Sequence, residues 1–369
     1  MFEESIKTTT IGDIYRTIYY NGPCSRQNIA DYLGLSLPTV TLNLSQLMEN
    51  NLIYNAGSFE STGGRKPYSY SCVPDARYSI GIDITKNHLS IVIIDLNNRI
   101  LASRRLRITF EDSDSYFQFA SDQAEELIDI SNISRSRILG CGISLPVIVN
   151  KDQKSISYAT VIDVSDQLYE HIQKHCIFPF LLFNDANSGG LAEAWHSTSN
   201  KNEVYLSLSS SVGGAVINAL NISIGSNCRA SEFGHITLFP NGRKCYCGKR
   251  GCVNAYCSAQ VLANFTDGNI QTFFDELNHN IGFQNCFDEY LDHLALTVNS
   301  LRMCYDCDVI LGGSVGAYMD DYLDLLKEKA SVLNPFEDNA DYIKTCRYKT
   351  EAAAAGAALY FVKQFISDM

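Results

Sequence analysis

The residues that could do chemistry gather in one short segment, from Gly234 to Cys252. Its candidate metal ligands are His235, Cys245, Cys247 and Cys252. Three thiolates and one imidazole form the Cys₃His set that closes a tetrahedral zinc shell. Gly248 and Gly251 would let the backbone turn tightly around one ion. Because four protein ligands leave no open coordination position, the sequence predicts a structural zinc ion rather than a catalytic one.

The surroundings of these ligands favour a metal site over a chance grouping in a chain with 13 cysteines. Nearby basic residues could offset the charge of the thiolates: Arg243, Lys244, Lys249 and Arg250. The cysteine spacing is not that of a secreted disulfide framework, and we expect no signal peptide at the start of the chain. We therefore expect a cytoplasmic protein with reduced thiols that can bind metal.

Bulk composition indicates a folded protein of two or three domains. The chain has 369 residues, of which 46% are hydrophobic and 19% are charged, as in globular proteins. Its longest apolar runs, such as Leu89 to Leu96, are too short to cross a bilayer, so no membrane partner is expected. A net charge of −12 argues against nucleic-acid binding by the whole surface. It still allows a small DNA-binding module at one end.

The N-terminal segment, residues 1–75, has the pattern of such a module. Apolar residues at helical spacing from Ile11 to Ile18 predict a first helix. Ser25 can cap a second, short helix, and Gly34 permits a tight turn before a third helix that starts at Ser36. A hairpin pattern follows over 52–70. This order predicts a winged helix-turn-helix, whose last helix enters the major groove.

The side chains expected to contact double-stranded operator DNA are Ser36, Thr39, Thr41, Asn43, Gly64, Arg65 and Lys66. The first four lie opposite the apolar positions Val40, Leu44 and Leu47 of the third helix. The last three form the wing tip, where basic side chains suit the electronegative minor groove. However, the third helix carries no Lys or Arg, and acidic residues outnumber basic ones seven to five up to Asp75. A three-helix docking domain is therefore the alternative.

The rest of the chain alternates strands and helices, which predicts an α/β body of two lobes. The expected boundaries are 76–183 for the first lobe, 184–349 for the second, and 350–369 for a final helix that completes the first. Predicted elements include a strand from Tyr78, a helix over 114–130 and a hairpin over 204–217. The final helix is rich in alanine, and its small faces would allow close packing against a sheet.

Five motifs occur together in this chain. They are the winged helix-turn-helix, GIDI at 81–84, FNDAN at 183–187, ExGH at 232–235 and CxCGxxGC at 245–252. In this combination essentially the whole chain resembles the ROK family, and the zinc loop is the most specific signature. The resemblance implies a two-lobed actin/hexokinase-like ATPase fold. The family contains sugar kinases and sugar-responsive repressors, and its members with this N-terminal module are transcriptional regulators.

The resemblance also implies the effector-binding residues Asn184, Asp185, Glu232, His235 and Asn254. Asn184 and Asp185 match a pair that hydrogen-bonds sugar hydroxyls, and Asp185 occupies the place of the kinase general base. His235 would bind zinc through one ring nitrogen and the sugar through the other. Asn254 stands where the family has a glutamate, so the effector is expected to differ from the usual hexose or to bind weakly. A purely structural role is the alternative, since Asn and Asp at a strand end are ordinary helix caps.

The phosphate-binding segments depart from those of the kinases. The family's Gly-Gly-Thr turn is replaced by residues 85–87, Thr-Lys-Asn, and its glycine-rich second loop by residues 209–215, Ser-Ser-Ser-Val-Gly-Gly-Ala. Side chains and restricted backbone freedom would obstruct a phosphate nest there. Gly312-Gly313, which matches the turn on the adenosine side, remains. We therefore expect a protein that is not an enzyme, with Asp185 kept for binding.

These observations predict a sugar-responsive DNA-binding regulator of carbohydrate metabolism, most simply a repressor. A homodimer or homotetramer would present two winged helices to a pseudo-palindromic operator. A sugar or sugar derivative in the cleft between the lobes would move them, and the linker over 73–78 would pass the motion to the DNA-binding module. The alternatives are an active carbohydrate kinase and a regulator controlled by a protein partner.

Overall fold

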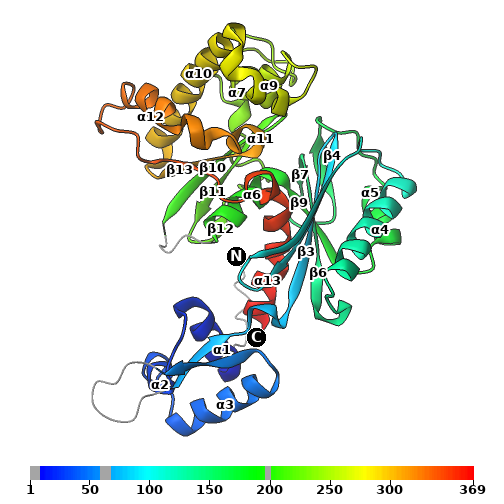
Figure 1. The fold of residues 1–369 in the computed structure, drawn as a ribbon, viewed down its shortest axis with the longest axis vertical. Coiled ribbons are helices and arrows are strands. Elements are labelled where there is room, and N and C mark those ends of the chain that lie inside the picture. The colour runs from blue at the N-terminus through cyan, green and yellow to red at the C-terminus, as the bar shows by residue number, and fades with distance from the viewer. Residues whose placement is uncertain (1–8, 59–67, 196–200) are drawn as a thin grey trace.

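The computed structural model describes residues 9–58, 68–195 and 201–369. They form an N-terminal module of three helices and a hairpin, followed by two lobes that are each built on a five-stranded sheet. The C-terminal helix runs from the junction of the lobes to the N-terminal module (Figure 1). The predicted fold class, a winged helix-turn-helix joined to a two-lobed α/β body, is confirmed.

Local sequence explains how the N-terminal module folds. Its elements are α1 (Thr10–Asn21), α2 (Arg26–Leu33), α3 (Leu37–Glu49), β1 (Ile53–Ser58) and β2 (Tyr68–Cys72). The side chains of Ser25 and Ser36 accept backbone N–H groups at the starts of α2 and α3, as helix caps do. Gly34 has a φ of 66°, which glycine adopts readily, and it turns the chain between the two helices.

The core and the wing of the module match the predicted pattern. Val40, Leu44 and Leu47 of α3 are at most 1% exposed, and β1 pairs with β2 in an antiparallel hairpin. The predicted wing tip, with Gly64, Arg65 and Lys66, lies outside the described residues.

The first lobe is a sheet in the order β5-β4-β3-β6-β9. Its elements are β3 (Tyr78–Ile84), β4 (His88–Asp95), β5 (Ile100–Arg107), α4 (Asp114–Ile130), β6 (Ile138–Leu145), β7 (Val147–Val149), β8 (Ile156–Ala159), α5 (Leu168–His175) and β9 (Phe180–Asn184). The first three strands are antiparallel, and β6 and β9 run parallel to β3. Helices α4 and α5 cover one face of this sheet (Figure 1). Strand β9 ends at Asn184, where the chain enters the second lobe at Asp185.

The second lobe is a sheet in the order β12-β11-β10-β13-β14. Its elements are α6 (Asp185–Ala194), β10 (Asn202–Leu208), β11 (Val212–Asn218), β12 (Asn221–Ile222), α7 (Asn254–Cys257), α8 (Ala259–Ala263), α9 (Ile270–Glu276), α10 (Ile281–Tyr305), β13 (Asp308–Gly312), α11 (Gly313–Gly316), α12 (Leu323–Ser331) and β14 (Ile343–Thr345). The long helix α10 was not predicted. Its buried residues Phe287, Leu291, Leu294 and Val298 recur at helical spacing.

Helix α13 (Ala352–Asp368) is the common support of the molecule. It packs against β3 and β6 of the first lobe and against α6 of the second. The close packing depends on glycines: a Cβ on Gly81 or Gly142 would lie 1.8 or 2.0 Å from a carbonyl oxygen of α13, and one on Gly356 would lie 1.7 Å from the Ser188 oxygen. The predicted close packing of this small-faced helix is thus confirmed. Within the described ranges, no helix has the length and apolar character that a membrane span requires.

The far end of α13 contacts the N-terminal module directly. Arg16 of α1 donates hydrogen bonds through Nη1 to the carbonyl oxygens of Ile366 and Ser367, at 3.3 and 3.2 Å. The rings of Tyr15 and Phe365 meet edge to face, with centroids 6.2 Å apart. The module and the lobes are therefore joined through α13 as well as through the predicted linker, where residues 74–76 form a 3₁₀ turn.

Candidate metal centre and ligand cavity

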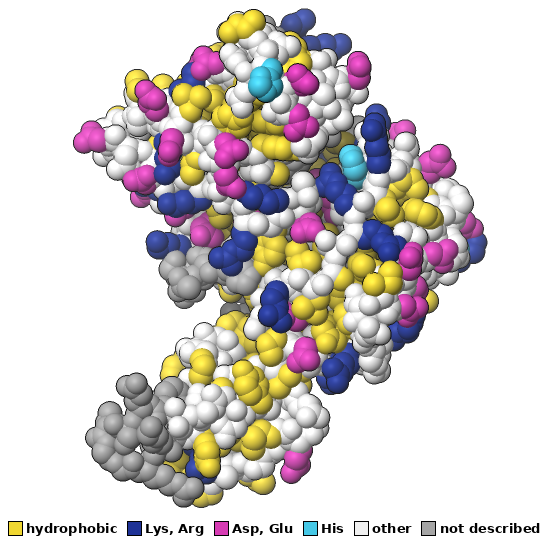
Figure 2. Space-filling model, viewed as in Figure 1, with side chains coloured by type: hydrophobic (Ala, Val, Ile, Leu, Met, Phe, Trp, Pro, Cys, Tyr) yellow, Lys and Arg dark blue, Asp and Glu magenta, His cyan; other side chains and the backbone are white. Residues whose placement is uncertain are grey.

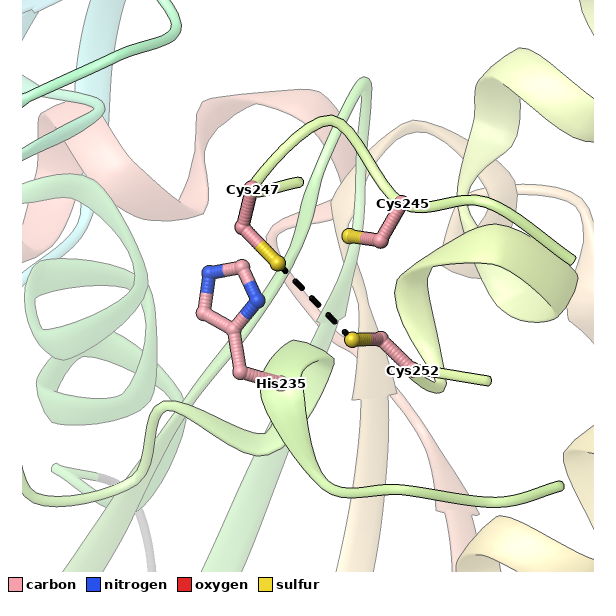
Figure 3. Close-up of side chains that lie close together, drawn as sticks. All are labelled: His235, Cys245, Cys247 and Cys252. Carbon is pink, nitrogen blue, oxygen red and sulfur yellow. Dashed lines mark hydrogen bonds between the residues drawn. The ribbon is translucent and has the colours of Figure 1, made fainter. Parts of the chain in front are cut away.

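The four predicted metal ligands converge on one point. One ligand atom from each of the four, His235, Cys245, Cys247 and Cys252, lies within 4.8 Å of the others. Figure 3 shows the three thiol groups and the imidazole ring of His235 turned toward a common centre. Cys245 and Cys252 are each 2% exposed, so the cluster is sheltered from solvent. This arrangement is compatible with a bound metal ion.

Two details of the cluster fit a tetrahedral ion. The Sγ atoms of Cys247 and Cys252 are 3.8 Å apart, and two thiolates at about 2.3 Å from a tetrahedral zinc ion would be separated by about 3.8 Å. The Nδ1 atom of His235 is buried without a hydrogen-bond partner, and it faces the sulfur atoms in Figure 3. A buried polar atom without a partner is costly, and a metal ion would satisfy it.

Two glycines shape the loop as the sequence predicted. Gly248 and Gly251 have φ values of 85° and 82°, a region that side chains disfavour. A Cβ on Gly251 would also lie 1.8 Å from the Phe239 oxygen. Arg243 is one of the basic residues expected to offset the charge of the thiolates. Its guanidinium forms an ion pair with Glu289 at 2.6 Å, so its charge is shared with that carboxylate.

A cavity of about 460 Å³ lies beside the metal cluster, between the two lobes. Its wall includes Asn184, Asp185, Glu232 and His235, four of the five predicted effector residues, together with Arg229 and Tyr246. The first two come from the junction of β9 and α6. Glu232 precedes the 3₁₀ turn η3 (Phe233–His235), and His235 is its last residue. The volume lies within the range of small-molecule sites, about 300–1,000 Å³.

Asn184 is both a cap and a wall residue. Its Oδ1 accepts the Asn187 N–H at 2.9 Å, and its Nδ2 donates to the Val147 oxygen at 3.0 Å and to Asp185 Oδ1 at 3.2 Å. The capping role that the sequence left open is therefore present. It fixes the side chain at the cavity wall and orients the neighbouring carboxylate.

Asp185 is the electrostatic centre of the cavity. Burial, followed by repulsion from the carboxylate of Asp83, raises its pKa to about 7. Burial likewise raises the pKa of Asp83 to about 6, although this carboxylate accepts a 2.5 Å hydrogen bond from Ser144. Two buried carboxylates near each other resist full ionisation. A ligand that donates hydroxyl hydrogen bonds would stabilise the charged form of Asp185.

His235 connects the metal cluster with the cavity. Its Nε2 lies 3.2 Å from the hydroxyl of Tyr246, whereas its Nδ1 faces the thiols. Gly234 lets this turn press against β11, since a Cβ there would lie 2.2 Å from the Val212 oxygen. The two ring nitrogens thus have different surroundings, and the predicted roles in binding zinc and sugar stay predictions.

Asn254 is the one member of the expected effector set that the cavity wall does not include. It is 6% exposed, and its Oδ1 accepts the N–H of Val212 at 2.7 Å. Its amide is thus turned toward the backbone of a wall residue. Asn254 would therefore affect a bound ligand indirectly, by holding the backbone of Val212 in the cavity wall.

A second cleft, of about 210 Å³, opens on the other side of Asp185 and contains the altered phosphate segments. Ser209 Oγ accepts the N–H of Ser314 at 3.4 Å, and the Tyr205 hydroxyl accepts the N–H of Gly313 at 3.2 Å. Amides at this turn are therefore already paired with side chains. The volume also lies below the usual range for small-molecule sites, about 300–1,000 Å³.

The predicted DNA-contacting residues that the structure describes lie at the start of α3 and along it. Ser36 is exposed and caps the helix, while Thr39, Thr41 and Asn43 are partly exposed. Asn43 Nδ2 donates to the Thr39 oxygen at 2.8 Å. In the face drawn in Figure 2, the N-terminal module carries few charged side chains. Arg16, one of its few basic residues, is engaged with α13 and was not singled out from the sequence.

This structure combines a winged helix-turn-helix, two lobes and a cysteine-rich loop beside an interlobe cavity. The combination points to one protein family. The ROK family pattern matches residues 79–364, and the chain belongs to that family. The xylose repressor of Bacillus spizizenii is 30% identical over 251 residues, which are 68% of this chain and 65% of that protein. The match thus spans just under two thirds of that relative.

Solved structures share the same architecture. A ROK family transcriptional regulator, a homolog of the E. coli MLC protein, aligns with a TM-score of 0.73 and 19% identity over 97% of this chain and 96% of its own. A ROK hexokinase from Thermus thermophilus aligns with a TM-score of 0.63 and 22% identity, covering 79% of this chain and 100% of its own. At these identities the likeness is one of fold. The regulator matches along nearly the whole chain, including the N-terminal module.

Proposed function

We propose that this protein is a sugar-responsive DNA-binding transcriptional repressor that performs no phosphoryl transfer. The observation that carries the proposal is the cavity of about 460 Å³, which gathers Asn184, Asp185, Glu232 and His235. The cleft beyond Asp185, in contrast, has its Gly313 and Ser314 amides paired with side chains. The similarity to a protein named xylose repressor supports the same function.

Hydroxyl-rich ligands suit this cavity. Two carboxylates offer acceptors, while Arg229 and His235 offer donors. We propose zinc as the ion, held by His235 Nδ1 and by Cys245, Cys247 and Cys252. Bound zinc supplies a structural crosslink with no open position. His235 would then keep Nε2 for the Tyr246 hydroxyl or for a sugar hydroxyl, and the metal would fix the orientation of the ring.

The effector signal would reach DNA through α13 and the linker together. A sugar that prefers one arrangement of the lobes shifts their equilibrium. Since α13 packs against both lobes and its last turn is bonded to Arg16, a lobe movement displaces α1 and thereby α3. A homodimer or homotetramer would place two copies of α3 in successive major grooves.

The test begins with the full chain loaded with zinc. It would be used to select binding sites from a random double-stranded DNA library, and occupancy of the selected site would be titrated with xylose, glucose and N-acetylglucosamine. We expect one sugar to release the DNA. Asp185→Asn should abolish that release, whereas Asp163→Asn, at an exposed position, should not. Failure to select any DNA, or DNA occupancy that no sugar changes, would refute the proposal.

A further inference from the structure

A further cavity, of about 450 Å³, lies between the lobes and against α13. It adjoins the cavity of about 460 Å³ that contains Asp185 and Glu232, here called the effector cavity. Asn184, Asn187 and Cys228 belong to the walls of both cavities. The rest of its wall comes from both lobes and from one face of α13. One wall residue, Ser367, also supplies a carbonyl oxygen to Arg16 of the N-terminal module. A molecule in this cavity would therefore touch both lobes and the helix that joins them to the module.

The wall is largely apolar and includes two cationic side chains. Leu182, Leu191, Leu220 and Ile222 supply aliphatic surface, while Lys151 and Lys363 are its charged residues, with no carboxylate among the lining residues that the structure describes. The effector cavity has the opposite character, with Asp185 and Glu232 in its wall. Lys151 is exposed, whereas Lys363 is partly buried, so Lys363 is the cation that this cavity shelters.

Lys363 is held in place but its charge is not balanced. Its Nζ donates to the Leu220 oxygen at 3.1 Å and to Asn221 Oδ1 at 3.2 Å, both neutral acceptors. Burial lowers its pKa, because the charged ammonium loses hydration. An ammonium has three donors, so one remains for a ligand. In the same wall, the hydroxyl of Ser188 and the Oδ1 of Asn187 are buried without a hydrogen-bond partner.

We propose that this cavity binds a small amphipathic anion, with a carboxylate or phosphate head at Lys363 and an apolar body against the aliphatic wall. An anion at Lys363 would form a charge-assisted hydrogen bond in a site that is partly shielded from water. The ligand is chemically distinct from a neutral sugar, and its site lies beside the effector site. This inference goes beyond the proposed function and does not require DNA binding.

Isothermal titration of the full, zinc-loaded chain tests the site. The probes are octanoate and octyl phosphate, below their micellar concentrations, with octanol and acetate as matched compounds that lack the charge or the apolar body. We expect both anions to bind and the other two to bind at least about tenfold more weakly. The relative affinities of the two anions identify the preferred head group.

Three variants make the result specific. Lys363→Met keeps the apolar stem, and it should weaken octanoate binding at least about tenfold. Lys344→Met is the control. Lys344 is exposed in β14, at the edge of the second-lobe sheet opposite β12, and its substitution should not change octanoate binding. Ile224→Trp, at a wall position that is 39% exposed, should block the cavity with little risk to folding.

Asp185 does not line this cavity, and Asp185→Asn keeps an Oδ1 that can accept the hydrogen bond from Asn184, so this variant should leave octanoate binding intact. Equal binding of octanol and octanoate would overturn the proposal. So would an octanoate affinity that is unchanged by both Lys363→Met and Ile224→Trp, or one that is abolished by Asp185→Asn.

Discussion

The two clefts that meet at Asp185 differ in which polar groups they leave for a ligand. On the effector side, the cavity wall presents Asp185, Glu232 and His235 around about 460 Å³. On the other side, only about 210 Å³ remains, and the amides of Gly313 and Ser314 are paired with side-chain hydroxyls. Both clefts belong to a fold shared with a hexokinase.

Under the proposed function, a kinase-like fold would keep sugar binding and lose phosphoryl transfer. Phosphoryl transfer requires free backbone amides and space around the phosphates of the donor. Sugar binding needs only converging donors and acceptors on one side of the carboxylate. Substitutions at positions such as Ser209, which lines only the smaller of the two clefts, would therefore affect transfer and leave the effector cavity in place.

The largest effect is expected from removing a metal ligand. This change disturbs the effector side and leaves the smaller cleft in place. Cys247→Ser leaves three ligands, and we expect loss of bound metal and a fall in the free energy of unfolding of on the order of 3 kcal/mol or more. Release of DNA by sugar should be lost as well, since His235 is no longer oriented. Metal content, urea unfolding and sugar titration measure these effects.

The matched control is Cys304→Ser, because Cys304 is an exposed cysteine at the end of α10. It should change the free energy of unfolding by less than about 0.5 kcal/mol. If Cys247→Ser keeps its metal and its sugar response, the cluster is not a metal centre.

The charge on Asp185 should make effector binding depend on pH. With its pKa raised to about 7, about a tenth of this group is ionised at pH 6 and about nine tenths at pH 8. A sugar that donates to the carboxylate should thus bind about tenfold more tightly at pH 8. Asp185→Asn should bind weakly at both pH values. A wild-type pH ratio that persists in this variant would assign the effect to another group.

The same carboxylate should influence stability in the opposite direction. Its folded pKa lies above its ordinary value because the native state favours the neutral form. That contribution is present at low pH and is lost as the pH rises through about 7. Thermal unfolding without ligand should therefore show a melting temperature that falls between pH 5.5 and 8, with a smaller fall in Asp185→Asn.

How far the sequence could predict this site depended on how local each contact is. The metal cluster was predictable because three of its ligands lie within eight residues, from Cys245 to Cys252. The cavity required the family resemblance to join Asn184 with Glu232, which lie on different elements. Helix α10 was missed although its apolar residues recur at helical spacing. The bond of Arg16 to Ser367 could not be read from the sequence, since the two residues are 351 positions apart.

The hydrogen bonds of Arg16 join α13 to the N-terminal module, so their removal tests whether α13 carries the sugar signal. Arg16→Met removes two hydrogen bonds to α13 and a 2.8 Å ion pair with Asp13, and we expect a loss of about 1–3 kcal/mol in the free energy of unfolding. The affinity for the selected DNA should remain, but its decrease on addition of sugar should become smaller. Arg26→Met, at an exposed position on α2, is the control for stability and for the size of the sugar response. If Arg16→Met responds to sugar as fully as the control does, α13 does not carry the signal.

The smallest effect is expected from ATP, and it tests the other side of the comparison directly. ATP should not raise the melting temperature of the wild-type protein, whereas the effector sugar should raise it by preferential binding to the folded state. The variant Ser209→Gly restores one glycine of the family's loop and frees the Ser314 amide from its 3.4 Å bond to Ser209, and Ser209 lines the smaller cleft but not the effector cavity. It should gain at most weak ATP binding, with sugar binding unchanged, because Ser209 and the Ser314 amide lie in the smaller cleft. A clear ATP shift in the wild type would show that the phosphate side is open and that the two clefts still act together.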